Sequence, residues 1–117
     1  MRHKVKKTKL NMAPDRKALL IRNLVTDLFL HGKIKTTTKR AKMTQQKAEK
    51  IITFAKTHTE MQTIRELKSF LLSEVASKRI IQEFLPKYKE QNSGFVRLIN
   101  GGFRKGDSAE ISYIELI

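Results

Sequence analysis

Residues 33–57 read KIKTTTKRAKMTQQKAEKIITFAKT, and this stretch decides the fold that we expect. It opens on a brief alternation that ends in β-branched residues, which predicts a short strand at 33–37. Thr38 suits a helix cap, and a helix is predicted over 39–57. Its apolar face comprises Ala41, Ala48, Ile51, Ile52 and Ala55. At about 100° per residue, five cations gather on the opposite side, namely Lys39, Arg40, Lys42, Lys47 and Lys50.

A second helical pattern precedes this stretch. Pro14 and Asp15 mark a helix start, because proline is tolerated in a first turn and an acid favours the positive helix end. Apolar residues then recur at helical spacing, so a helix is predicted over 15–31. Gly32 follows, and it can supply the left-handed conformation that ends a helix.

The rest of the chain adds two helices and two strands. Helices are predicted over 60–73 and 76–89, and Pro86 should end or kink the second. The first of these would turn four apolar side chains inward: Ile64, Leu67, Phe70 and Leu71. Strands are predicted at 95–99 and 110–116, joined by a loop at 101–107 that contains three glycines.

These elements follow the order α-β-α-α-α-β-β, which indicates the α+β class. The simplest packing is a small three-stranded mixed sheet with helices packed on one face. The last two strands are neighbours in sequence, so they should pair antiparallel. The strand at 33–37 would join this hairpin across the helical crossover.

The chain of 117 residues suits one domain. We expect a basic extended N-terminal arm at 1–13 and a single globular domain at 14–117. The absence of cysteine excludes disulfides and thiolate metal sites. Apolar runs are only a few residues long, so neither a membrane span nor a secretory signal is expected.

Positive charge is concentrated in the first half. Residues 1–56 contain 16 Lys and Arg against three acids, a net charge of +13, whereas residues 57–117 contain nine against eight, a net charge of +1. The first ten residues alone contain five Lys and Arg and no acid, and such a segment requires a polyanion, most commonly nucleic acid and next an anionic membrane surface. A merely solubilising tail is the alternative.

No constellation in the sequence indicates catalysis or metal binding. The three histidines, at positions 3, 31 and 58, have no ligand spacing, and no nucleophile elbow is present. The glycine loop leads into a strand, unlike a nucleotide-binding loop. One interpretation is a wide hairpin turn that needs small residues. The other is a loop whose backbone approaches nucleic acid closely, with Arg104 and Lys105 contacting phosphates and Phe103 packing or stacking. The two interpretations are compatible.

The remaining feature is a set of positively charged residues, most of which are lysines. Lysine suits the neutralisation of phosphates more than the recognition of bases. Few aromatic residues are placed to stack on unpaired bases, so we expect the partner to be a folded RNA. Composition alone does not exclude DNA. The candidate RNA-binding residues are Arg2, His3, Lys4, Lys6, Lys7, Lys9, Arg16, Lys17, Arg22, Lys33, Lys35, Thr36, Thr37, Lys39, Arg40, Lys42, Lys50, Arg97, Arg104 and Lys105.

Several motifs along the whole chain resemble one family. They are the opening Met1-Arg2-His3-Lys4, then Arg22-Asn23-Leu24-Val25, Lys35-Thr36-Thr37, Lys39-Arg40-Ala41-Lys42, Ala48-Glu49-Lys50-Ile51-Ile52, Gly94-Phe95-Val96-Arg97-Leu98, Arg104-Lys105-Gly106-Asp107 and Tyr113-Ile114-Glu115-Leu116. No single motif is decisive, but their order and spacing resemble bacterial large-ribosomal-subunit protein seventeen.

The resemblance implies a structural protein of the large ribosomal subunit. It would bind and stabilise the large-subunit ribosomal RNA near the rim of the polypeptide exit tunnel, beside neighbouring large-subunit proteins. It implies no enzymatic activity, no cofactor, no small-molecule substrate and no membrane partner. The expected location is the ribosome of the cytoplasm.

Two other classes remain open from the residues alone. A free DNA-packaging or regulatory protein would co-purify with DNA and usually carry a dimer interface. An RNA-modifying enzyme would need a catalytic cluster or cofactor loop, which the sequence does not reveal. Sedimentation of a cell lysate through a sucrose gradient would separate these classes.

Overall fold

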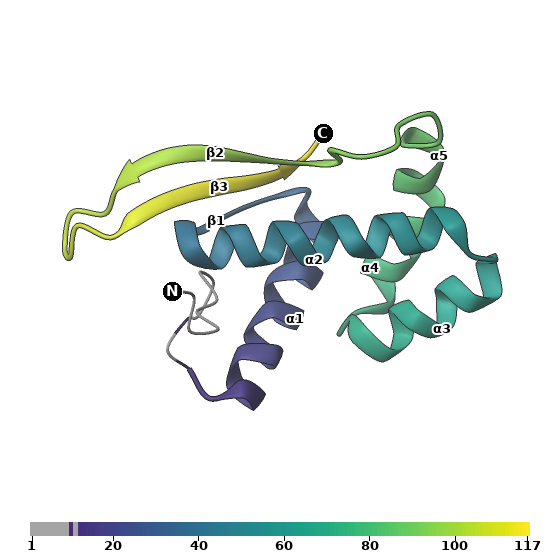
Figure 1. The fold of residues 1–117 in the computed structure, drawn as a ribbon, viewed down its shortest axis with the longest axis horizontal. Coiled ribbons are helices and arrows are strands. Elements are labelled where there is room, and N and C mark those ends of the chain that lie inside the picture. Colours follow the sequence, from purple (N-terminus) through teal and green to yellow (C-terminus); the bar gives the residue numbers. More distant parts are fainter. Residues whose placement is uncertain (1–9, 11) are drawn as a thin grey trace, which may run out of the picture.

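Helices lie on one side of a long hairpin in the computed structural model, which describes residue 10 and residues 12–117 (Figure 1). The elements are α1 (Pro14–His31), β1 (Lys33–Thr37), α2 (Thr38–Thr57), α3 (Glu60–Phe70), α4 (Glu74–Arg79), η1 (Ile80–Phe84), α5 (Leu85–Lys87), β2 (Val96–Phe103) and β3 (Glu110–Leu116). The predicted α+β class is confirmed. Most of the arm predicted at 1–13 lies outside the described residues.

Gly32 makes the sharp turn from α1 into β1. Its φ of 78° lies in the left-handed region, which glycine adopts without a steric penalty. Its backbone N–H donates to Leu28 O at 2.7 Å, which satisfies one of the free carbonyls at the helix end. The predicted helix stop is therefore confirmed, and β1 begins at the next residue.

The sheet has three strands in the order β1-β3-β2, with helices against one face (Figure 1). Both pairs are antiparallel, with Lys33 opposite Glu115 and Arg97 opposite the same Glu115. The expectation of a mixed sheet is therefore wrong. β1 and β2 do run in the same direction, but β3 lies between them, so no parallel pair forms.

The hairpin is longer than the sequence predicts. β2 continues through the glycines to Phe103, and the turn begins only afterwards, so the expected loop at 101–107 is partly strand. A bulge lies between Asn100 and Phe103, and Gly102 has a φ of 82° there. The ring of Tyr113 covers Gly101, because a Cβ at that position would lie 2.8 Å from Tyr113 Cε2. Glycine is thus required for this close approach.

The core is a single cluster built around α2, which packs against α1 and all three strands. Ala41, Ala48 and Ile52 of α2 have no exposed surface, as the helical periodicity predicts. Each large aliphatic side chain buried in this way contributes about 1.5–3 kcal/mol to folding. Tyr88 closes the far side of the core, and its hydroxyl donates to Ile117 O at 2.7 Å. Its pKa is raised by burial and, secondarily, by the negative charge of Glu49.

The two later helices differ in detail from the prediction. α3 ends at Phe70, and the helix expected over 76–89 runs from Glu74 to Lys87 through the π-helical turn η1. Pro86 has no N–H to donate, and the preceding Leu85 N–H bonds to Ile80 O, five residues back. Ile64 was expected to be inward but is 43% exposed. Leu67 is buried as expected, and Thr63 faces the core in place of Ile64.

Candidate nucleic-acid interface

The first turn of α2 combines positive charge with a positive helix end. Lys39, Arg40 and Lys42 are all exposed there, and the turn contains no acid. Unpaired backbone N–H groups give a helix N-terminus about half a positive charge, so each added cation is unfavourable by about 0.3–1 kcal/mol. An anion placed at this end reverses the sign of that interaction, and phosphates bind such positions.

An exposed stripe continues along α2 from this turn. Lys39, Lys42 and Lys50 lie on the side of the helix opposite its buried alanines, as the periodicity predicts. Glu49 is the only acid of α2, but it is half-buried and accepts a hydrogen bond from the Val96 N–H at 2.9 Å. Among the described residues, none of the four salt bridges includes a residue of α2. The stripe is therefore left for an external anion.

Lys47 lies on a different side of α2, in a groove between α1 and α2. The groove has a volume of about 520 Å³ and is also lined by Lys17, Arg22 and Phe70. Lys47 Nζ lies 4.5 Å from the centre of the Phe70 ring, a cation–π contact. Arg22 Nε donates to Phe70 O at 2.7 Å, so this candidate also ties α1 to the end of α3. Sequence reasoning placed Lys47 on the basic face but did not select it as a site residue.

The face of the sheet that points away from the helices holds three more candidates. Ile34, Leu98 and Ile114 pack toward the core, so alternation turns their neighbours outward. Lys33 and Arg97 both pair with Glu115, at 4.0 and 3.2 Å. Lys33 and Lys35 also lie 5.0 and 5.9 Å from the centre of the Tyr113 ring. The cations here are thus gathered in one place, but one carboxylate partly neutralises them.

The turn of the hairpin holds Arg104 in an internal ion pair. Arg104 Nε and Nη2 donate to the two oxygens of Asp107 at 2.9 and 2.6 Å. This pairing, together with the Ala109 N–H, lowers the pKa of the Asp107 carboxyl to about 2 and raises that of Arg104. Lys105 beside it is exposed and forms no salt bridge among the described residues.

A small hollow links the hairpin to the start of α2. It is lined by Thr37 and Lys39 on one side and by Ala109 and Glu110 on the other. The Thr38 and Ser112 hydroxyls share a hydrogen bond of 2.8 Å across the same junction. The basic first turn of α2 and the turn end of the hairpin therefore form one continuous region.

The remaining candidates are more dispersed. Arg16 is exposed near the start of α1, while Thr36 and Thr37 are half-buried at the end of β1. Six candidates lie outside the described residues: Arg2, His3, Lys4, Lys6, Lys7 and Lys9. No local sequence pattern predicts that Arg22 bonds to the end of α3, because this contact joins segments 48 residues apart. The Arg104–Asp107 pair is local, three residues apart, and depends on how the hairpin turn folds.

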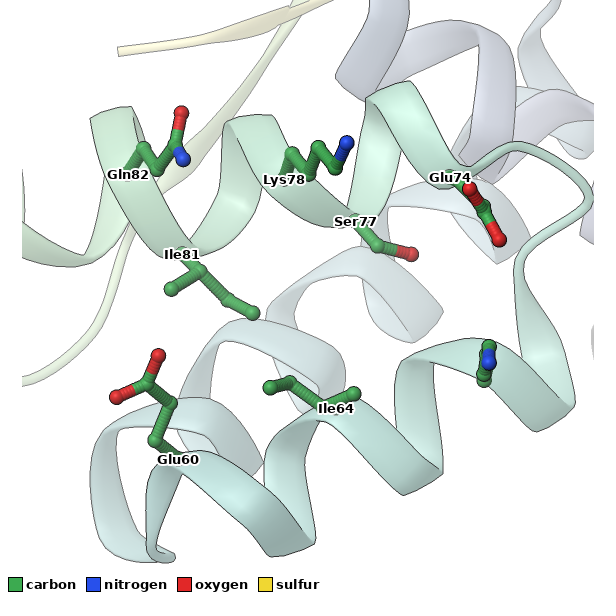
Figure 2. A pocket seen from close by; sticks show the side chains of 8 residues that line it. Glu60, Ile64, Glu74, Ser77, Lys78, Ile81 and Gln82 are labelled. Atoms are coloured by element: carbon green, nitrogen blue, oxygen red, sulfur yellow. The ribbon is translucent and has the colours of Figure 1, made fainter.

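The second half of the chain presents a surface of another kind. A groove of about 310 Å³ runs between α3 and the α4–η1 segment, where Ile64 and Ile81 face each other (Figure 2). Two acids and two lysines surround this apolar floor: Glu60, Lys68, Glu74 and Lys78. The charges balance, so this groove lacks the character of a phosphate site.

Neither a metal-binding cluster nor a membrane-spanning helix is found within residue 10 and residues 12–117. No group of three or more His, Asp or Glu side chains there is arranged to hold a metal ion. None of the helices in that part of the chain has the length and apolar character needed to cross a bilayer.

Comparison with known proteins gives a consistent result. The family model described as "Ribosomal protein L17" matches residues 20–117. A protein of Clostridium acetobutylicum named "Large ribosomal subunit protein bL17" is 43% identical over 109 residues, which cover 93% of this chain and 95% of that protein. Proteins of the same name from Clostridium botulinum and Clostridium beijerinckii are each 42% identical over 109 residues, covering 93% of this chain and 96% of each relative.

Proposed function

Since this chain belongs to the ribosomal protein L17 family, whose members are structural and not enzymatic, we propose that it binds and stabilises folded large-subunit ribosomal RNA by neutralising phosphates. A structural role in the large ribosomal subunit follows from the family. The finer proposal is that the RNA lies near the rim of the polypeptide exit tunnel, in the cytoplasm, beside other proteins of the large subunit.

The observation that carries this proposal is the cation cluster at the first turn of α2. Lys39, Arg40 and Lys42 repel one another and the helix end, and no acid of that turn offsets them. A protein that remained free in solution would gain stability from replacing them. Converging RNA backbones supply the missing negative charge at the same place.

Rigid placement of these cations favours binding. α2 is anchored by its buried face, so its exposed stripe is ordered before RNA arrives and little further conformational entropy is lost. We propose that the basic segment 1–13 adds a second contact where RNA helices crowd. Counterion release would then drive much of the affinity, with a salt slope of about −0.7 to −0.9 per phosphate contact.

Sedimentation of a cell lysate through a sucrose gradient tests the proposal. We expect the protein to migrate with the large ribosomal subunit at low salt and to be released as the salt concentration rises. Treatment of the lysate with ribonuclease should shift it to the top of the gradient, whereas deoxyribonuclease should not. Migration with the nucleoid, or as free protein at low salt, would contradict the proposal.

A further inference from the structure

Phe103 is the most exposed large hydrophobic side chain in the described part of the molecule. It is 74% exposed, compared with 65% for Met61 and 58% for Val75. An aromatic side chain buries roughly 150–250 Å² when it is fully packed. A ring that remains in water therefore does not contribute this hydrophobic stabilisation. Such a ring on a ribosomal protein requires an explanation in terms of what covers it.

The hairpin holds this ring at a defined position. Figure 1 shows the β2–β3 turn projecting past the start of α2, at the end of the molecule opposite α3. Behind Phe103, the Gly102 N–H donates to Asn100 Oδ1 at 3.0 Å. Ahead of it, the Arg104 N–H donates to Ala109 O at 2.8 Å, and the Ser108 N–H donates to Arg104 O at 2.9 Å.

The charged groups around Phe103 indicate what kind of partner it meets. Lys105 is two residues away and exposed, and Lys39 lies across the hollow that Ala109 and Glu110 line beside the turn. Glu110 is directly opposite Phe103 in the strand pairing, so their side chains are neighbours. A carboxylate repels phosphate but accepts hydrogen bonds from the amino groups of bases.

We propose that Phe103 is a stacking platform for an unpaired nucleobase of the RNA, with Glu110 beside it as an acceptor for the base and Lys105 on the adjoining phosphate. This inference rests on the proposed function and assigns a base contact where that function requires only backbone contacts. Proteins recognise RNA at loops and bulges in this way, by stacking splayed bases on aromatic side chains. A rigid tip suits this role because it loses little freedom on binding.

The alternative occupant is an apolar pocket on a neighbouring protein. RNA is favoured by the two lysines, Lys105 at the tip and Lys39 across the hollow, since Arg104 is already paired with Asp107 and an apolar protein pocket would leave both lysines without an anion. The experiment below distinguishes the two.

The chain contains no tryptophan, so Phe103→Trp introduces a single fluorescent reporter. The full-length variant is titrated with deproteinised large-subunit ribosomal RNA. The matched control is Met61→Trp, at a similarly exposed position on α3, which lies at the opposite end of the molecule from the hairpin turn (Figure 1). We expect RNA to quench the tryptophan fluorescence of the Phe103→Trp variant strongly and that of the control weakly. Equal quenching of both, or a blue shift without quenching only in assembled subunits, would overturn the inference.

Affinities of three further variants give an independent readout. Phe103→Ala should weaken RNA binding by about 5- to 150-fold, the range expected for one stacked base. Phe103→Tyr should bind within about twofold of the parent, and Phe103→Leu should fall between them because it keeps apolar area without an aromatic face. If all three bind as the parent does, the inference is wrong while the proposed function stands. If the parent itself fails to bind this RNA, both fail.

Discussion

The two halves of the molecule share one core but differ sharply in charge. Of the 18 buried residues in the core cluster, nine lie in residues 1–56 and nine in residues 57–117. The first half nevertheless carries a net charge of +13 and the second a net charge of +1. Because both halves meet the same requirements of folding, the excess charge is not a property that the fold demands. It belongs to what the molecule binds.

The cations of the halves also differ in their partners. Arg79, Arg97 and Arg104 of the second half each pair with a carboxylate. Among the described cations of the first half, only Lys33 does so, at 4.0 Å. The following predictions test whether this difference separates binding from folding.

Deletion of residues 1–13 should produce the largest loss of RNA binding. It removes five Lys and Arg, so the slope of log affinity against log salt should become shallower by about 3.5–4.5. In the part of the chain that the structure describes, every residue of the core cluster lies outside this segment, so the melting temperature should hardly change. Filter binding across a salt series and circular dichroism measure the two effects. Normal incorporation of the truncated chain into large subunits would refute the role of the arm.

Charge reversal on α2 should have the next largest effect. Changing Lys39, Lys42 and Lys50 together to Glu should reduce the salt slope by about 2–3 and weaken binding at every salt concentration. The matched control reverses Lys68, Lys78 and Lys87, which are equally exposed but lie in the second half. An equal loss in both triple variants would show that only total charge matters.

A substitution in the second half should change folding without changing binding. Thr63 is buried in α3, and its hydroxyl has no hydrogen-bond partner within the described structure. Thr63→Val should therefore raise the free energy of unfolding by about 1 kcal/mol, which is a few degrees in melting temperature. The control is Thr44→Val, since the buried Thr44 hydroxyl donates to Arg40 O at 2.8 Å and its removal should give no such gain. A change in RNA affinity for Thr63→Val would show that this site in the second half affects binding as well as folding.

The smallest effect should be a local titration at the hairpin turn. The pKa of Asp107 is lowered from 3.8 to about 2, so its stabilising interaction with Arg104 is complete above pH 3.8 and is lost as the pH falls toward 2. In Arg104→Gln the pKa of the Asp107 carboxyl should rise toward its ordinary value but stay below it, because the Ala109 N–H still donates to the carboxyl, whereas in Lys105→Gln the pKa should not move. Carboxyl carbon chemical shifts followed by NMR measure this. An unshifted Asp107 in the parent protein would mean that Arg104 is free.

The sequence predicts the fold where local chemistry dominates. Gly32, the strand at 33–37 and the apolar face of α2 follow from backbone freedom, alternation and periodicity, and the structure confirms all three. It fails where distant segments decide. The placement of β3 between β1 and β2 excludes a parallel pair, and the contact of Gly101 with the Tyr113 ring extends a strand through glycines.

The candidate interface divides in a similar way. The cations of α2 can be read from the sequence because one helix arranges them. By contrast, two hydrogen bonds depend on tertiary contacts: the Val96 N–H donates to the Glu49 carboxylate, and Arg22 donates to Phe70 O. No local pattern reports whether an arginine is free or engaged.

The central position of β3 has a consequence for the order of events during synthesis. Neither β1 nor β2 has a neighbour in the sheet until residues 110–116 exist, although the basic residues of the first half are made long before. The sheet can close only after residue 116 has left the ribosome that makes it. Until then the polycationic half of a nascent chain lacks the strand that pairs with β1, and we expect chaperone protection or prompt capture by RNA to matter most in that interval.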